Sequence, residues 1–426
     1  MGPPTETTPL GNVFPASRSI DANGMVALSF AVLVGTAIVT CLFMAWVLGA
    51  NSNSPPFAPA IGANAISTMQ AAFVIGILAA AGALMQGGSI SETVGADLID
   101  GVAITPLAAT AGLLTAAGFM AVGIYTRYPI PAAFATTGAM VGVGLSLGGD
   151  PAMATYQRLG TFWLLVPFMS GGLAYSTAVT LRRDDIPESV GVPLLAGIVG
   201  AIVANIRLGV IPDPVADQGT LARFVSRQFG GGPTLVADVS LGVVLVTVAA
   251  GAAAFYWVRQ RILVDVEGGI RSFLLVLGGI VAFSSGGSQV GLATGPLENL
   301  FRVELGLPGI TLLAIGAVGI LAGAWMASPR LLQATSREYA QLGVRRSIAA
   351  LVPGFIIAQL AIALGIPISL NNIILSGVIG GGLAAGSAGV SRRKIGFTVT
   401  FWLLTLGSSI VVGYGVYQLF AAVIGG

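Results

Sequence analysis

Long apolar stretches recur along the whole chain, from about residue 26 to about residue 421. Each is long enough to cross a lipid bilayer as a helix, which takes about 20 residues. Only 8% of the 426 residues are charged, whereas a soluble domain carries about 25%. The weak ten-residue alternation that is typical of outer-membrane strands is absent. We therefore predict an all-α polytopic membrane protein that lies within a lipid bilayer.

A hydropathy window of about 19 residues predicts about twelve transmembrane helices. They lie near residues 26–49, 70–86, 103–125, 131–148, 161–181, 190–206, 234–258, 272–292, 309–326, 347–364, 369–390 and 397–421. Thirteen of the 19 basic residues fall in loops that follow odd-numbered helices. Because positively charged loops stay in the cytoplasm, we expect both termini on the extracytoplasmic side of the plasma membrane. Residues 1–24 are polar and lack the features of a signal peptide, so we expect a flexible tail there.

Four short segments recur in the same order at nearly the same spacing. The pairs are Gly49-Ala50-Asn51-Ser52 with Gly286-Gly287-Ser288-Gln289, Gly82-Ala83-Leu84-Met85 with Gly323-Ala324-Trp325-Met326, Pro129-Ile130-Pro131 with Pro367-Ile368-Ser369, and Gly142-Val143-Gly144-Leu145 with Gly380-Gly381-Gly382-Leu383. The copies lie seven predicted helices apart, and because seven is odd the second copy enters the membrane upside down. We expect a first repeat at 25–189, connecting helices and a long extracytoplasmic loop at 190–262, and a second repeat at 263–426. Inverted repeats of this kind are typical of secondary transporters.

Polar side chains within the apolar surroundings are few, and they gather where Pro and Gly are dense. The candidate substrate-binding residues are Asn51, Ser52, Asn53, Thr136, Thr137, Ser285, Ser288, Gln289, Ser369, Asn371 and Asn372. Pro and Gly at this density predict broken helices near the bilayer midplane, which are tolerated where they line a cavity. The free N–H groups at the start of a half-helix form an anion site, and hydroxyl and amide groups add neutral hydrogen bonds. The alternative is that these residues only join neighbouring helices.

At these residues the chain resembles the inorganic phosphate transporter (PiT) family, which includes phosphate and sulfate permeases. The resemblance covers about residues 26 to 421. That family has two inverted copies of a Gly-Ala-Asn-Asp segment, each followed by a Pro-Val-Ser-Thr-Thr-His hairpin and a Gly-rich helix. The matching segments here begin at Gly49 and Gly286, and the hairpins begin at Pro129 and Pro367. The resemblance implies an oxyanion transporter with two inverted repeats.

The chain departs from the family pattern at its ionisable positions. Ser52 and Gln289 replace the two Asp residues, and Phe134 and Asn372 replace the two His residues. In the family the acidic groups are associated with sodium. Because hard cations prefer carboxylate and carbonyl oxygens, the neutral residues predict at most a weak cation site near Asn51, Ser52, Ser288 and Gln289. The metal and the coupling ion stay open on this ground.

Motifs for enzyme chemistry are missing from the sequence. The chain has no His, one Cys and no Gly-x-x-x-x-Gly-Lys phosphate loop, so we predict neither an enzyme nor a bound cofactor. The scattered basic residues argue against a nucleic-acid partner. We predict a secondary transporter for phosphate or a similar tetrahedral oxyanion, working by alternating access with a co-transported proton or sodium ion. A sulfate permease, a carrier of a neutral or cationic solute, a passive channel and a homodimer are left open.

Overall fold

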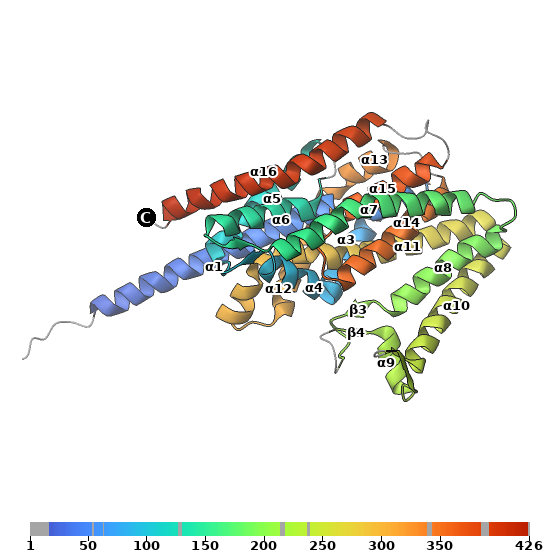
Figure 1. The fold of residues 1–426 in the computed structure, drawn as a ribbon, viewed down its shortest axis with the longest axis horizontal. Coiled ribbons are helices and arrows are strands. Elements are labelled where there is room, and N and C mark those ends of the chain that lie inside the picture. The colour runs from blue at the N-terminus through green and yellow to red at the C-terminus, as the bar shows by residue number, and fades with distance from the viewer. Residues whose placement is uncertain are drawn as a thin grey trace, which may run out of the picture.

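The computed structural model describes residues 17–52, 55–62, 64–126, 130–213, 218–236, 239–338, 343–384 and 392–424. The chain is helical over most of these residues (Figure 1). The helices are α1 (Ser17–Asn51), η1 (Pro55–Phe57), α2 (Ala58–Gly62), α3 (Thr68–Gln86), α4 (Gly88–Ala96), α5 (Pro106–Thr126), α6 (Ala132–Ser146), α7 (Met153–Thr180), α8 (Glu188–Ala204), α9 (Leu221–Gln228), α10 (Leu241–Val264), α11 (Val266–Thr294), η2 (Gly295–Leu297), η3 (Leu300–Glu304), α12 (Gly309–Met326), α13 (Ser328–Glu338), α14 (Val344–Ala363), α15 (Leu370–Leu383) and α16 (Arg392–Ile424).

Three two-stranded antiparallel ribbons lie in the connections between helices. They pair β1 (Ile99–Asp100) with β2 (Asp150–Pro151), β3 (Arg207–Leu208) with β4 (Gly219–Thr220), and β5 (Thr234–Val236) with β6 (Val239–Ser240). Helices α8 and α10 pack against each other at one side of the bundle, and α9 lies at their end (Figure 1). The start of α1 and the end of α16 lie at the same end of the bundle (Figure 1).

Nine helices in the described part of the chain are long and apolar enough to cross a membrane. They are α1, α3, α5, α7, α10, α11, α12, α14 and α16, with α11 counted through to Leu297. The three other predicted spans are also apolar helices, but α6, α8 and α15 are shorter. At 1.5 Å per residue a 15-residue helix extends only about 22 Å, less than the hydrocarbon core of about 30 Å. The chain is therefore a multi-pass membrane protein, and the count of twelve spans stays a prediction.

Glycines hold four long helices in close contact, α1 with α12 and α3 with α11. At each contact a Cβ atom on the glycine would overlap a backbone carbonyl oxygen of the facing helix. The pairs are Gly49 with Ile320, Gly323 with Trp46, Gly286 with Ala79, and Gly82 with Phe283. The pairs correspond between the two halves: Gly49 and Gly286 are 237 residues apart in the sequence, and Gly82 and Gly323 are 241 residues apart. Close helix approach at small residues is how membrane helices pack without a hydrophobic driving force between them.

Each of the two short helices α6 and α15 packs against a long helix from the other half of the chain. Helix α6 lies along α16, and α15 lies along α7. The Ser409 hydroxyl donates to the carbonyl oxygen of Phe134 at 3.4 Å, and the Ser170 hydroxyl donates to that of Ile373 at 2.6 Å. Ser409 lies 239 residues after Ser170, and Ile373 lies 239 residues after Phe134. The short helix of each half therefore packs against a long helix of the other half.

The second expected helix break does not fall at Ser288 and Gln289, but after them, where α11 ends and η2 begins at Gly295. Helix α11 runs without interruption from Val266 to Thr294. The glycines in this segment face neighbouring backbone, because Gly286 meets α3 and Gly291 meets the start of α4. They serve close packing and leave the helix intact. The first break is present, since α1 ends at Asn51 and is followed by η1 and α2.

Only part of the predicted N-terminal tail, residues 1–24, is described by the structure. Helix α1 begins at Ser17, inside the segment that was expected to be a tail. Residues 1–16 lie outside the described residues.

The glycine contacts can be tested with one substitution and one matched control. In Gly286→Ala the added methyl group must push α11 away from Ala79, an overpacking that costs about 1–3 kcal/mol. Gly172 in α7 has open space around its Cα, so Gly172→Ala should be neutral or slightly stabilising through helix propensity. The measurement is the apparent melting temperature in detergent. Equal melting of Gly286→Ala and wild type would contradict the close contact.

Candidate functional site

Two helices start inside the protein without a cap. Helix α6 follows Pro131 and α15 follows Ser369, and both preceding residues have extended backbone. Neither N-terminus is capped by a side-chain hydrogen bond. The first-turn N–H groups of a helix have no partner within it, and its N-terminus carries a partial positive charge. The two hairpins therefore place two anion-attracting helix ends among buried residues.

Side-chain amides hold the backbone of both hairpins. The Asn51 amide N–H₂ donates to the carbonyl oxygen of Ile130 at 3.0 Å, and the Gln289 amide donates to that of Ile368 at 3.3 Å. Each donor is 79 residues before its acceptor, so the two bonds are equivalent in the two halves. The Asn371 amide also donates to the Ile130 carbonyl, at 3.0 Å. This bond joins the second hairpin directly to the first.

The same bonds fix the direction of the amide oxygens. Only the N–H₂ end of an amide can donate to a carbonyl, so the oxygen must lie on the other side. The oxygens of Asn51, Gln289, Asn371 and Asn372 are buried and have no hydrogen-bond partner in the described part of the chain. Burying an acceptor without a donor costs free energy. These four oxygens are therefore free to accept a proton donor or to bind a cation.

Buried hydroxyl groups at the hairpins are also without partners within the described residues. They belong to Ser52, Thr136, Thr137 and Ser369. Elsewhere in the bundle Thr110 and Thr115 donate to the carbonyl one turn earlier, both at 2.8 Å. Threonines in a membrane helix usually satisfy their hydroxyl in this way. Thr136 and Thr137 do not, so their hydroxyls remain available as donors.

The structure brings most of the predicted site residues together. Gln289 donates to the Ser288 hydroxyl at 3.2 Å, and Ser288 donates to the carbonyl of Ser285 at 3.0 Å. Asn51, Gln289 and Asn371 share the hairpin carbonyls. Ser52 follows α1, Thr136 and Thr137 lie in the second turn of α6, and Ser369 and Asn372 lie at the start of α15. Asn53 lies outside the described residues. None of these side chains is charged, and their role in binding stays a prediction.

The described residues contain no metal centre built from carboxylate or histidine side chains. No group of three or more His, Cys, Asp or Glu residues there could hold a metal ion. A cation at the hairpins would have to be held by neutral oxygens, such as those of Asn51, Gln289 and Asn371.

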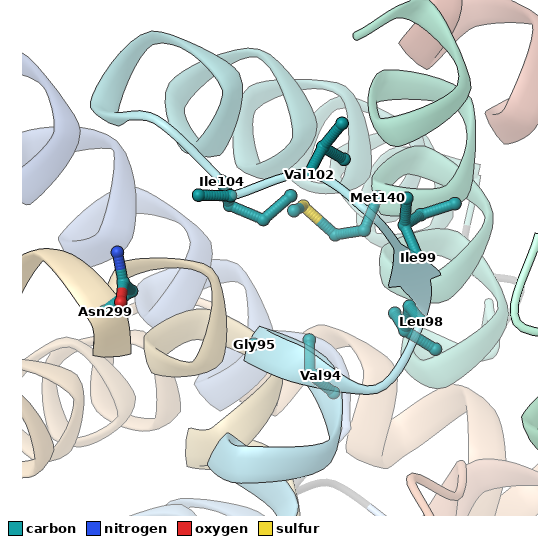
Figure 2. A pocket seen from close by; sticks show the side chains of 9 residues that line it. Val94, Gly95, Leu98, Ile99, Val102, Ile104, Met140 and Asn299 are labelled. Atoms are coloured by element: carbon teal, nitrogen blue, oxygen red, sulfur yellow. The ribbon is translucent and has the colours of Figure 1, made fainter. Parts of the chain in front are cut away.

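The cavity in Figure 2 is separate from the hairpins. It has a volume of about 210 Å³ and lies between the end of α4, β1 and α6. Its lining is apolar apart from Asn299, and none of the predicted site residues contributes to it. Met140 lines it from α6, one helical turn after Thr136. An oxyanion would find too few donors there.

Three side chains near the site, two of them buried and Trp163 half-buried, were missed by sequence reasoning, which looked only at polar clusters. Trp163 donates its Nε1–H to the carbonyl of Pro367 at 2.8 Å and packs on the ring of Phe134. Trp402 is buried with its Nε1–H unpaired among the described residues, and Gln86 is buried beside Gly287 with both amide atoms unpaired. The spacing of 239 residues between the two tryptophans, close to the repeat spacing, was a signal that could have found them.

Relatives of known name match nearly the whole chain. A protein of Thermococcus kodakarensis named as a phosphate permease is 22% identical, over 90% of this chain and 96% of its own length. The chloroplastic inorganic phosphate transporter 2-1 of Arabidopsis thaliana is 24% identical, over 91% of this chain and 73% of its own length.

A solved structure has the same fold. The chain named as the sodium-dependent phosphate transporter superimposes with a TM-score of 0.78 at 21% identity, covering 92% of this chain and 100% of that chain.

The family comparison covers residues 48–413, which is most of the chain and includes both hairpins. The matching family is described as the phosphate transporter family, so a transporter rather than an enzyme is the correct class, as predicted. The chain belongs to the phosphate transporter family.

Proposed function

We propose that this protein is a secondary transporter that carries inorganic phosphate across the plasma membrane by alternating access, together with a cation. The observation that carries the proposal is that buried donors and buried acceptors, unpaired among the described residues, gather at two uncapped helix starts. A buried polar group without a partner is costly, and a transported ion pair would supply the missing partners.

The donors suit the anion. Thr136 and Thr137 lie in the second turn of α6, and Ser369 is the N-cap of α15, near helix ends that attract negative charge. All of these donors are neutral, so the anion is held by hydrogen bonds without a permanent counter-charge. Phosphate is favoured over sulfate because its P–OH group can donate to a bare amide oxygen, whereas sulfate at neutral pH only accepts. Sulfate remains the alternative substrate.

The amide oxygens suit a cation. Moving a divalent anion inward against about 100 mV costs roughly 4.6 kcal/mol, at about 2.3 kcal/mol for each charge, so a coupled cation is needed for accumulation. None of the described site residues has a side chain that titrates near neutral pH, so a proton has no carrier group there. Neutral carbonyl-type oxygens are ligands for a hard cation. Sodium, held by Asn51, Gln289 and Asn371, is therefore our proposed partner ion.

Alternating access needs two similar halves that can exchange their arrangements. The glycine contacts, the serine contacts and the amide bonds each occur twice at nearly the same sequence spacing. These pairs support inverted repeats at 25–189 and 263–426, with 190–262 as the connection. Both ends of the described chain lie at one end of the bundle (Figure 1), which supports the placing of both termini on the same side of the membrane. Assembly as a homodimer stays a prediction.

The first test is uptake into proteoliposomes. Labelled phosphate or sulfate is supplied outside, with sodium and proton gradients imposed separately. We expect phosphate to accumulate with an inward sodium gradient and more weakly with a proton gradient alone, because the described site holds amide oxygens and no titratable side chain. Protein-free liposomes are the control. Failure to accumulate phosphate under any gradient would contradict the proposal, and preferential uptake of sulfate would replace the substrate.

The second test removes the bare hydroxyls. In Thr136→Val with Thr137→Val the two donors are lost while the side-chain shape is kept. Because a hydrogen bond to a charged group is worth about 1.5–3 kcal/mol, the Kd for phosphate should rise at least about tenfold. The ligand-free melting temperature should stay the same or rise, since unpaired buried hydroxyls have been removed.

The matched control for this test is Thr110→Val with Thr115→Val. These hydroxyls bond their own helix, so their loss should leave phosphate binding unchanged. Unchanged phosphate affinity in the Thr136 and Thr137 variant would assign these residues to helix packing instead.

A further inference from the structure

The indole of Trp402 in α16 is a buried hydrogen-bond donor that has no acceptor among the described residues. Its residue is 7% exposed, and its Nε1–H has no partner in the part of the chain that the structure describes. An indole N–H can donate but cannot accept, so a cation cannot satisfy it. The missing partner must be an acceptor, which means a carbonyl, a water molecule or an anion.

The packing of α16 on α6 places Trp402 at the first hairpin. Ser409 donates to the Phe134 carbonyl in the first turn of α6, and Gly142, two turns later in α6, meets Ile410 and Tyr414. The two helices therefore run in the same direction. Gly138, nearly two turns into α6, meets Ser409 and Leu406. Trp402 comes about two turns before Ser409, and so lies near the level of the start of α6.

The second half of the molecule contains the same arrangement with its donor satisfied. Trp163 lies seven residues before Ser170, as Trp402 lies seven residues before Ser409. Ser170 bonds the first turn of α15, and the Trp163 Nε1–H donates to the Pro367 carbonyl just before that helix. Trp163 thus shows where an indole at this position points, which is toward the start of the neighbouring short helix. In the first half the residue that corresponds to Pro367 is Pro129, which lies outside the described residues, and the Trp402 Nε1–H has no partner among the described ones.

Unpaired donors therefore concentrate at the start of α6. Thr136 and Thr137 add two bare hydroxyls in the helix that α16 covers, and the uncapped helix end adds backbone N–H groups. The indole N–H, the threonine hydroxyls and the backbone N–H groups are all uncharged donors near the start of α6. A single acceptor with several oxygens could bind to all three kinds. We propose that the Trp402 Nε1–H donates a hydrogen bond to the transported oxyanion, which is bound at the start of α6. This inference rests on the proposed function of the same site.

The test compares Trp402→Phe with Trp163→Phe, each of which keeps an aromatic ring and loses the N–H. We expect Trp402→Phe to raise the Kd for inorganic phosphate at least about tenfold with an unchanged ligand-free melting temperature, since the lost donor has no partner among the described residues. Trp163→Phe should lower the melting temperature, because the Pro367 carbonyl loses its donor, and should change the Kd less.

A direct readout uses protein labelled with ¹⁵N in its five tryptophan indoles. The signal that is missing in Trp402→Phe belongs to Trp402, and it should shift when phosphate is added to the wild type, while the Trp163 signal should move less. A static Trp402 signal together with unchanged affinity in Trp402→Phe overturns the inference, even if the wild type transports phosphate. A Trp402→Phe variant that melts earlier but binds phosphate normally also overturns it, because the indole then has a partner inside the protein. Absence of phosphate binding by the wild type removes the proposed function and the inference together.

Discussion

The carbonyl oxygen of Ile130 accepts hydrogen bonds from both halves of the molecule. It accepts one hydrogen bond from Asn51 at the end of α1 and one from Asn371 in the first turn of α15. Inside a bilayer a hairpin carbonyl has no water to bond, so the protein must supply its donors. Supplying them with amide side chains has a second effect, because every N–H₂ that faces the hairpin turns a bare oxygen to the other side. The requirement that stabilises the hairpin thus also creates the acceptors of the site.

Much of the fold could be predicted from residue type and spacing. Each of the twelve predicted spans contains an apolar helix, because mean apolarity over 19 residues depends little on tertiary contacts. The repeat spacing found in four short segments reappears as paired contacts, such as Gly49 with Ile320 and Gly286 with Ala79. The second break lies at Gly295 and not at Ser288 and Gln289, because glycine has two roles in membrane helices, and spacing alone does not separate a helix breaker from a close-packing surface.

The candidate site was predictable to a similar degree. Asn51, Gln289 and Asn371 could be selected because polar residues are rare in these spans, and the structure places their amides on the hairpin carbonyls. Their exact partners depend on which helix of the other half lies opposite, and a single sequence does not contain that information. Trp402 was missed because an aromatic residue in an apolar span has the same pattern as a lipid-facing or core residue. Only its unpaired indole nitrogen distinguishes it.

The packing of each short helix against the other half has a consequence for biosynthesis. Helix α6 packs against α16, which is made about 250 residues later, and a helix that is too short to cross the bilayer cannot rest stably without its neighbour. Helix α6 also packs against α5, which precedes it, but the face of α6 that α16 covers stays open until α16 has been made. Chains halted before α16 would expose that face to lipid, which makes such truncated chains natural targets for membrane quality-control proteases.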